Sequence, residues 1–168
     1  MRIRQLNKPL FVGIFLLLIW ACHEDESHDK VNAAEEVSRT LDRWHRAAAE
    51  ADFDTYFSLM DRDAIFVGTD ASEVWNKDAF MAFAKPYFDK GKAWHFKKIN
   101  RHVYRDSVSP ATVWFDETLD TWMGGCRGSG VLINKDGKWL IKHYVLSLTV
   151  PNEKMNQVIS VIRHDSLR

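Results

Sequence analysis

Hydrophobic residues recur at helical spacing in three stretches between residues 31 and 91. The first stripe contains Val37, Leu41, Trp44 and Ala48, and it predicts a helix of about 18 residues. Asp52 and Asn76 belong to the residue types that cap helix N-termini, so each predicts a further helix. The inward residues expected on these two helices are Phe53, Tyr56, Phe57, Met60, Phe80, Phe83, Ala84, Tyr87 and Phe88. The third helix should end at Gly91, and Pro86 should bend or interrupt it because proline has no N–H to donate.

The pattern then changes to strand-like runs. Residues 64–67 predict a strand ahead of the third helix, and residues 94–104, 112–123, 127–134 and 138–150 predict four more after it. Short turns between the last four indicate an antiparallel meander. A final amphipathic stretch at residues 155–162 predicts a short C-terminal helix. Helices packed on one face of a strongly curved antiparallel sheet would make an α+β domain.

Glu117 interrupts an apolar strand face. In residues 112–123, alternate positions Val113, Phe115, Leu119 and Met123 are apolar, and Glu117 lies on the same side. An inward carboxylate must be hydrogen-bonded, paired, protonated or exposed to a wet cavity. We therefore expect Glu117 at a functional pocket.

Two interpretations of Glu117 stay open at this point. Burial can raise the pKa of a carboxyl and make it a general acid or base. Alternatively, Glu117 forms a structural ion pair with Arg127 on the following strand. His45 flanks the stripe of the first helix, where it would either exchange protons with a substrate or serve as a hydrogen-bonded histidine at the edge of the core.

Other candidate residues surround the same expected pocket. Asp70 follows a strand end, where it either contacts a ligand or hydrogen-bonds within its own turn. Arg127 offers a planar set of donors for a ligand carboxylate, and Tyr144 offers a hydroxyl. Most tryptophans are expected in the core, with Trp75 and Trp114 taken as pocket-lining candidates.

The N-terminus has the pattern of a bacterial lipoprotein signal peptide. Arg2, Arg4 and Lys8 precede an apolar run at residues 10–20, which Ala21 and Cys22 follow. The run is shorter than the roughly 20 residues of a membrane-spanning helix. We expect residues 1–21 to be removed, Cys22 to be lipidated, and residues 22–32 to form a flexible acidic tether; an uncleaved anchor or ordinary secretion are the alternatives. The expected location is the bacterial cell envelope, facing the periplasm or the cell surface.

Charge and cysteine content narrow the possible partners. The chain has 23 Lys and Arg against 23 Asp and Glu, and loss of residues 1–21 removes three cations and no anion. The resulting slightly acidic domain gives no indication of nucleic-acid binding. If Cys22 carries lipid, Cys126 has no partner within the chain. Common zinc, nucleophile and dinucleotide motifs are absent from the sequence, so we expect no metal and no cofactor.

Several short motifs resemble the SnoaL-like group of the nuclear-transport-factor-2-like (NTF2-like) superfamily. They are residues 66–70 (FVGTD) with Glu73 and Trp75, residues 86–88 (PYF) with Gly91 and Trp94, residues 114–117 (WFDE), residues 127–132 (RGSGVL), and residues 137–139 (GKW) with Tyr144. The resemblance implies a cone-shaped sheet around the first helix over residues 33–152, followed by a short helix and tail at 153–168.

The resemblance also implies a pocket for a small, partly apolar molecule, often within a homodimer. It does not select one reaction, because the superfamily includes binders and enzymes. The leading hypothesis is a small-molecule-binding domain. The alternatives are a cofactor-free isomerase, dehydratase or hydrolase that uses Glu117 or His45, and a non-catalytic structural or protein-interaction module.

Overall fold

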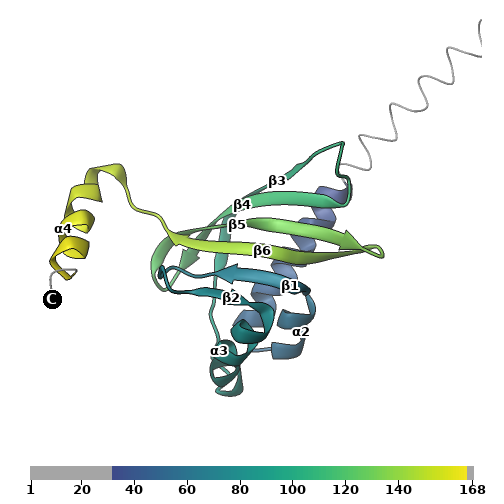
Figure 1. The fold of residues 1–168 in the computed structure, drawn as a ribbon, viewed down its shortest axis with the longest axis horizontal. Helices are drawn as coiled ribbons and strands as arrows, with labels where there is room; N and C mark the ends of the chain where they lie inside the picture. Colours follow the sequence, from purple (N-terminus) through teal and green to yellow (C-terminus); the bar gives the residue numbers. More distant parts are fainter. Residues whose placement is uncertain (1–31, 166–168) are drawn as a thin grey trace, which may run out of the picture. The chain divides into compact units, whose positions relative to one another are not determined.

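A computed structural model describes residues 32–165 of the chain (Figure 1). Its elements are a first helix over residues 32–49, then α2 (Phe53–Ser58), β1 (Met60–Val67), β2 (Val74–Asn76), α3 (Lys77–Asp89), β3 (Lys97–Arg105), β4 (Thr112–Thr121), β5 (Gly124–Lys135), β6 (Lys138–Leu148), the 3-10 turn η1 (Asn152–Lys154) and α4 (Met155–Asp165). The predicted signal peptide, Cys22 and all of the tether except residue 32 lie outside the described residues.

Six strands form one sheet in the order β2-β1-β6-β5-β4-β3. The antiparallel meander from β3 to β6 is confirmed. β1 begins at Met60 rather than at Ala64, and it pairs with β6 in parallel. β2 was not predicted, because three residues are too few to show alternation. Register irregularities in the β3–β4 and β5–β6 pairs introduce local bends, which contribute to the curvature of the sheet.

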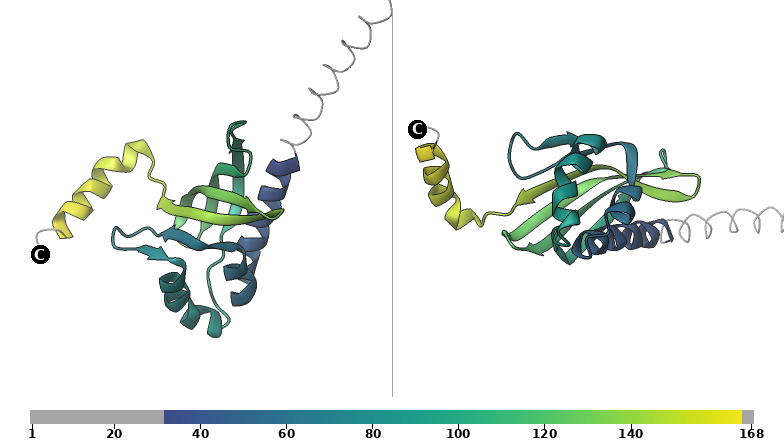
Figure 2. Two further views of the ribbon diagram at one scale, coloured as in Figure 1. Left: turned by 45° about the vertical axis from the view of Figure 1, so that its right-hand side comes forward. Right: turned by 90° about the horizontal axis from the view of Figure 1, so that it is seen from below.

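The first helix lies against one face of this sheet (Figures 1 and 2). Val37, Leu41, Trp44 and Ala48 are all buried, as the spacing predicted. α2 begins after Asp52, whose Oδ1 accepts a hydrogen bond from the Thr55 amide at 3.0 Å. The α+β class with N-terminal helices on a curved sheet is therefore confirmed.

α3 follows its predicted cap but not its whole predicted inward face. The Asn76 side chain accepts from the Ala79 amide at 2.9 Å, and Gly91 adopts φ +67° just after the helix. The helix continues through Pro86 instead of breaking there. Phe80, Ala84 and Phe88 are buried, whereas Phe83 and Tyr87 remain 40% and 48% exposed, so the expectation that both lie inward was wrong.

The predicted C-terminal helix is present as α4, which carries Met155, Ile159, Val161 and Ile162 as partly exposed apolar residues. Within residues 32–165, no helix has the length and apolar character to cross a membrane.

Candidate functional site

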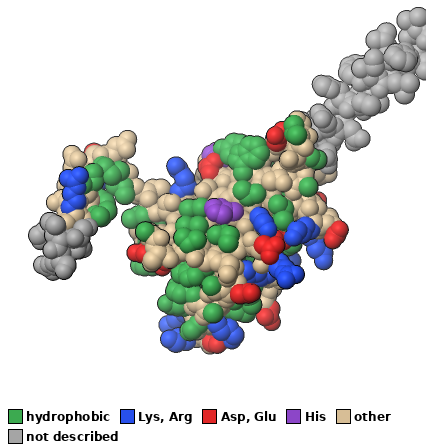
Figure 3. Space-filling model, in the orientation of Figure 1, with side chains coloured by type: hydrophobic (Ala, Val, Ile, Leu, Met, Phe, Trp, Pro, Cys, Tyr) green, Lys and Arg blue, Asp and Glu red, His purple; other side chains and the backbone are tan. Residues whose placement is uncertain are grey.

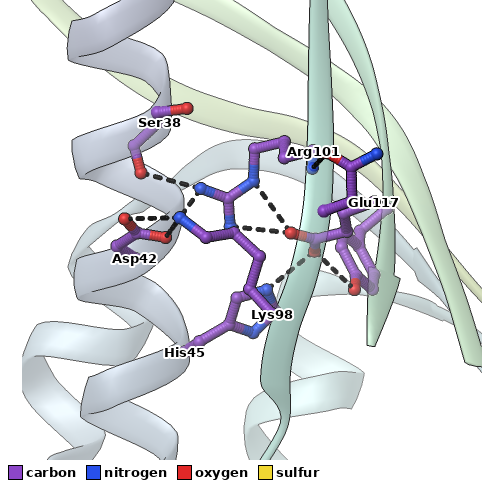
Figure 4. A network of polar contacts seen from close by, with 8 residues as sticks. Ser38, Asp42, His45, Lys98, Arg101 and Glu117 are labelled. Carbon is purple, nitrogen blue, oxygen red and sulfur yellow. Dashed lines mark hydrogen bonds and ion pairs between the residues drawn. The ribbon is translucent and has the colours of Figure 1, made fainter. Parts of the chain in front are cut away.

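Glu117 points into the interior from β4, as the strand alternation predicted, and it is completely buried. Nε2 of His45, on the first helix, lies 2.7 Å from Glu117 Oε1, and the Tyr144 hydroxyl on β6 donates to the same oxygen at 3.1 Å. Arg101 on β3 donates to Oε2 from Nε at 2.9 Å and from Nη2 at 2.7 Å. Both carboxylate oxygens are therefore occupied (Figure 4).

Arg101 extends this network to the backbone and surface of the first helix. Its Nη1 donates to the Ser38 carbonyl oxygen at 2.9 Å and to Asp42 Oδ1 at 2.7 Å. Lys98 also pairs with Asp42, at 2.9 Å. The Arg101 side chain is only 3% exposed, whereas Asp42 is 43% exposed, so the charge contacts run from the core to solvent. We call Glu117, His45, Tyr144, Arg101 and Asp42 the ionic network.

The ion pair predicted between Glu117 and Arg127 is absent, so that prediction was wrong. Arg127 lies opposite Thr118 on β4, while Gly128 lies opposite Glu117. Since successive strand residues face opposite sides, Arg127 projects from the outer face of the sheet and is exposed. The cation that pairs with Glu117 is Arg101, its direct cross-strand neighbour in the β3–β4 register.

The contacts of Glu117 keep it ionised. Burial by itself would raise the pKa of the carboxyl, but the hydrogen bond and charge of His45 and the charge of Arg101 outweigh burial and lower the pKa. An ionised carboxylate only accepts hydrogen bonds, so His45 Nε2 is a donor to it. Burial, followed by the charge of Glu117, raises the pKa of the Tyr144 hydroxyl, which stays protonated and donates.

Gly128 makes room for this arrangement. A Cβ at this position would lie 2.2 Å from the Tyr144 hydroxyl oxygen and 3.0 Å from Glu117 Cγ. Glycine is required here because the β5 backbone passes directly beside the Tyr144–Glu117 hydrogen bond.

A separate pocket of about 150 Å³ is lined mainly by aromatic side chains. Seven rings line it, together with Met123, Leu146, Gly68, Thr69 and Glu73. The ring residues are Phe66, Trp75, Phe80, Phe83, Trp94, Phe96 and Trp122. Trp122 is 81% exposed, so the lining reaches the surface. We call this space the aromatic pocket.

Aromatic rings separate the pocket from the ionic network. Phe66 lines the pocket and stacks on Tyr144, with ring centroids 5.5 Å apart. Phe96 also lines the pocket, and its ring lies 6.2 Å from that of His45. Glu117 and Tyr144 are not among the lining residues. Tyr144 and His45 of the ionic network thus lie behind the rings of the pocket wall.

The predicted ligand-binding residues lie in different places. Trp75 lines the aromatic pocket. Trp114 and Arg127 lie on the outer face of the sheet, where Trp114 is 46% exposed and stacks on Tyr104. Asp70 stabilises its own turn by accepting from the Ser72 amide at 2.8 Å and the Ser72 hydroxyl at 2.5 Å. Of the lining residues, only Trp75 was a pocket candidate from the sequence, and neither Glu73 nor Trp122 was.

Cys126 is a free, buried residue, in agreement with a packing role. In the part of the chain that the structure describes, no cluster of histidine, cysteine, aspartate or glutamate has an arrangement that would hold a metal ion.

The curved six-stranded sheet with its helices on one face is the NTF2-like fold. An NTF2-like protein of unknown function from Pseudomonas putida superposes with a TM-score of 0.60 at 14% identity, covering 74% of this chain and 92% of that one. An NTF2-like family member from Streptomyces avermitilis, provisionally named a dehydratase, gives 0.61 at 14% identity, with 73% and 99% covered. A protein from Novosphingobium aromaticivorans, provisionally named a scytalone dehydratase, gives 0.61 at 11% identity, with 74% and 89% covered.

These identities are low, so the structures establish a common fold alone. No curated protein matches the chain. A family model does: the chain belongs to the SnoaL-like domain family, whose model matches residues 37–151.

Proposed function

We propose that this SnoaL-like domain binds a small, partly apolar molecule in the aromatic pocket. The observation that carries the proposal is the set of seven rings around a space of about 150 Å³ that reaches the surface at Trp122. A cavity of this size accepts one benzene-like ring, and ligand sites are characteristically concave and lined by aromatic side chains.

The binding test uses tert-butylbenzene as a neutral aromatic probe, titrated into the full chain and followed by tryptophan fluorescence. Trp122→Ala should weaken binding by about tenfold, because it removes one ring of the lining. Val108→Ala is the control, since it shortens an exposed apolar side chain that does not line the pocket. Equal effects of the two substitutions, or no saturable binding, would refute the pocket as the site.

A cofactor-free acid–base enzyme is the second candidate function. His45, Glu117 and Tyr144 lie directly behind Phe66 and Phe96, and two of the similar structures carry provisional dehydratase names. Because both oxygens of Glu117 are occupied and its pKa is lowered, His45 is the candidate for proton transfer; it lies behind Phe96 of the aromatic pocket and also lines a separate surface groove. Mass spectrometry of whatever co-purifies with the chain, before and after incubation, distinguishes turnover from simple binding. If the compound is converted and His45→Gln abolishes the conversion, the enzyme hypothesis is favoured. If the compound stays unchanged, the binding hypothesis is favoured.

The third candidate function is a structural or protein-interaction module. The outer face of the sheet offers a surface for such an interaction. Tyr104, Trp114 and Val131 lie in one row across β3, β4 and β5, and Figure 3 shows hydrophobic side chains grouped on this face. We propose that a second copy of the chain covers it to form a homodimer, since exposed apolar patches commonly mark interaction surfaces. Analytical ultracentrifugation should show a dimer that Trp114→Glu converts to a monomer. A wild-type monomer at all concentrations would exclude this assembly.

For location, the proposal is a lipid anchor at Cys22 after removal of residues 1–21, with the domain held at the bacterial envelope by the acidic tether. The proposal is supported by the order of segments at the N-terminus, where basic residues precede an apolar run that ends near Cys22. Cys22→Ala should move the protein from the membrane fraction to the soluble fraction. An unchanged membrane fraction that contains uncleaved precursor would instead indicate a signal anchor.

A further inference from the structure

Among the described residues that line the aromatic pocket, Glu73 is the only ionisable one. It lies just before β2, in the loop that follows β1, and it is partly buried. All the other lining side chains are aromatic, aliphatic or small and uncharged. A single negative group therefore sets the charge of the whole pocket lining.

Local contacts hold the Glu73 side chain against the pocket wall. Its Oε2 accepts a hydrogen bond from the Asp70 amide at 3.2 Å, and its backbone carbonyl accepts from the Gly68 amide at 2.8 Å. A Cβ at position 68 would lie 2.2 Å from Oε2, so the absence of a side chain at Gly68 lets the carboxylate lie over the end of β1. The carboxylate is thus positioned by its own loop.

Within residues 32–165, the structure gives Glu73 no ion pair with a lysine, arginine or histidine. This differs from Asp61, whose carboxylate contacts Lys135 and Lys142, and from Glu117, whose carboxylate contacts Arg101. A carboxylate with one neutral donor keeps most of its capacity to attract a cation. The charge of Glu73 is therefore available to a ligand.

The rings favour the same class of ligand as the carboxylate. The face of an aromatic ring is electron-rich, and it attracts ammonium groups most strongly where water is displaced. Trp75 and Trp94 offer the best ring type for this interaction and flank a space that one compact group fills. An anionic ligand would be repelled by Glu73, and a neutral one would leave the carboxylate without a cationic partner.

We propose that the aromatic pocket selects an organic ammonium cation, whose positive group lies between the rings and the Glu73 carboxylate. This inference rests on the proposed function, because it assumes that the pocket is the binding site, and it adds the charge of the ligand.

The test compares two probes of the same shape, phenyltrimethylammonium and its uncharged isostere tert-butylbenzene, on the full chain. We expect the cation to bind about tenfold more tightly than the isostere. Glu73→Gln should abolish most of that preference while leaving the affinity for tert-butylbenzene unchanged, because the glutamine amide oxygen can still accept from the Asp70 N–H. Asp54→Asn is the charge-matched control: it removes a carboxylate that lines a different surface groove, and it should leave the preference intact.

The possible failures are distinguishable. Saturable binding of tert-butylbenzene that equals or exceeds that of the cation would overturn the charge preference and leave the pocket as a site for neutral molecules. A preference that survives Glu73→Gln but is lost in Asp54→Asn would place the recognition outside this pocket. Absence of binding by both probes would overturn the proposed function together with this inference.

Discussion

Glu117 joins four elements through one carboxylate, since its partners lie on the first helix, β3 and β6 while it belongs to β4. Glu117→Gln removes the charge and leaves Arg101, which is almost fully buried, paired only with the half-exposed Asp42. We expect the free energy of unfolding to fall by about 3 kcal/mol, because breaking a buried ion pair leaves an uncompensated charge. Urea denaturation measures this loss.

Asp42→Asn provides the comparison for that experiment. Its carboxylate is close to the surface, so its removal should cost at most about 1 kcal/mol. If Glu117→Gln changes stability no more than Asp42→Asn does, the interior pair is not a stabilising contact of the kind inferred here.

Gly128→Ala should disrupt the contact between Tyr144 and Glu117. The new methyl group would overlap the tyrosine hydroxyl, and we expect a loss of about 1–3 kcal/mol from the resulting overpacking. Combining it with Tyr144→Phe removes the overlapping oxygen, so the double variant should lose less than the sum of the two single losses. Additive losses would show that the strand, rather than the hydroxyl, is sensitive to the methyl group.

The inward direction of Glu117 was predictable from alternation alone, but its partner depended on strand register. Residues 106–111 connect β3 to β4, and a hairpin centred on that loop places Arg101 opposite Glu117. The mostly polar sequence of β3 concealed this pairing, because it shows no apolar alternation that would mark an inward side. Glu73 was missed for a different reason: its role comes from the position of its loop beside the rings.

At the scale of elements, N-cap residues and hydrophobic periodicity predicted where the helices lie. They did not predict how much of the circumference of each helix would be buried. The apolar residues of α3 cover more of its circumference than the contacts with β1 and β2 bury, so Phe83 remains half exposed. Phe83 and Phe80 instead extend to the pocket lining. In the sequence of α3, the apolar residues in excess of those needed for one packed face were therefore the feature that indicated a binding surface.

The start of α3 sets the position of those rings. Asn76→Ala removes the oxygen that accepts from the Ala79 amide, and we expect a loss of about 1 kcal/mol in the free energy of unfolding. Hydrogen exchange should also become faster in the first turn of the helix. Asn76→Asp keeps an acceptor at the same place and should preserve both properties; a loss as large as that of alanine would argue against the cap.

Across the whole molecule, two buried carboxylates connect different parts of the sheet. Asp61 on β1 contacts Lys135 on β5 and Lys142 on β6, and it is 1% exposed. Burial would raise its pKa, but the hydrogen bonds from Lys135 and Lys142 outweigh burial and hold the pKa well below its usual range. Glu117 also has a lowered pKa, so both groups favour the folded state when ionised.

Lowering the pH should therefore destabilise the fold over a defined pH range. The stabilisation by both groups is fully present above the ordinary carboxyl pKa, about 4. It is lost as the pH falls toward their lower pKa values in the folded state, because the unfolded chain takes up protons first. Urea midpoints measured from pH 7 to pH 3 should fall below about pH 4.5. The double variant Asp61→Asn, Glu117→Gln should show a shallower decline, and equal slopes would assign the acid sensitivity to other groups.

The separation of pocket rings from buried ions has a consequence for how this domain can change. Phe66 and Phe96 contact the ionic network and should couple to it, whereas substitutions at the other lining rings should be close to additive with those in the ion pairs. Recognition can then diverge among relatives, or be redesigned by directed evolution, without rebuilding the scaffold. Trp122, which is mostly exposed in the turn between β4 and β5, is the position where such diversification should be tolerated best.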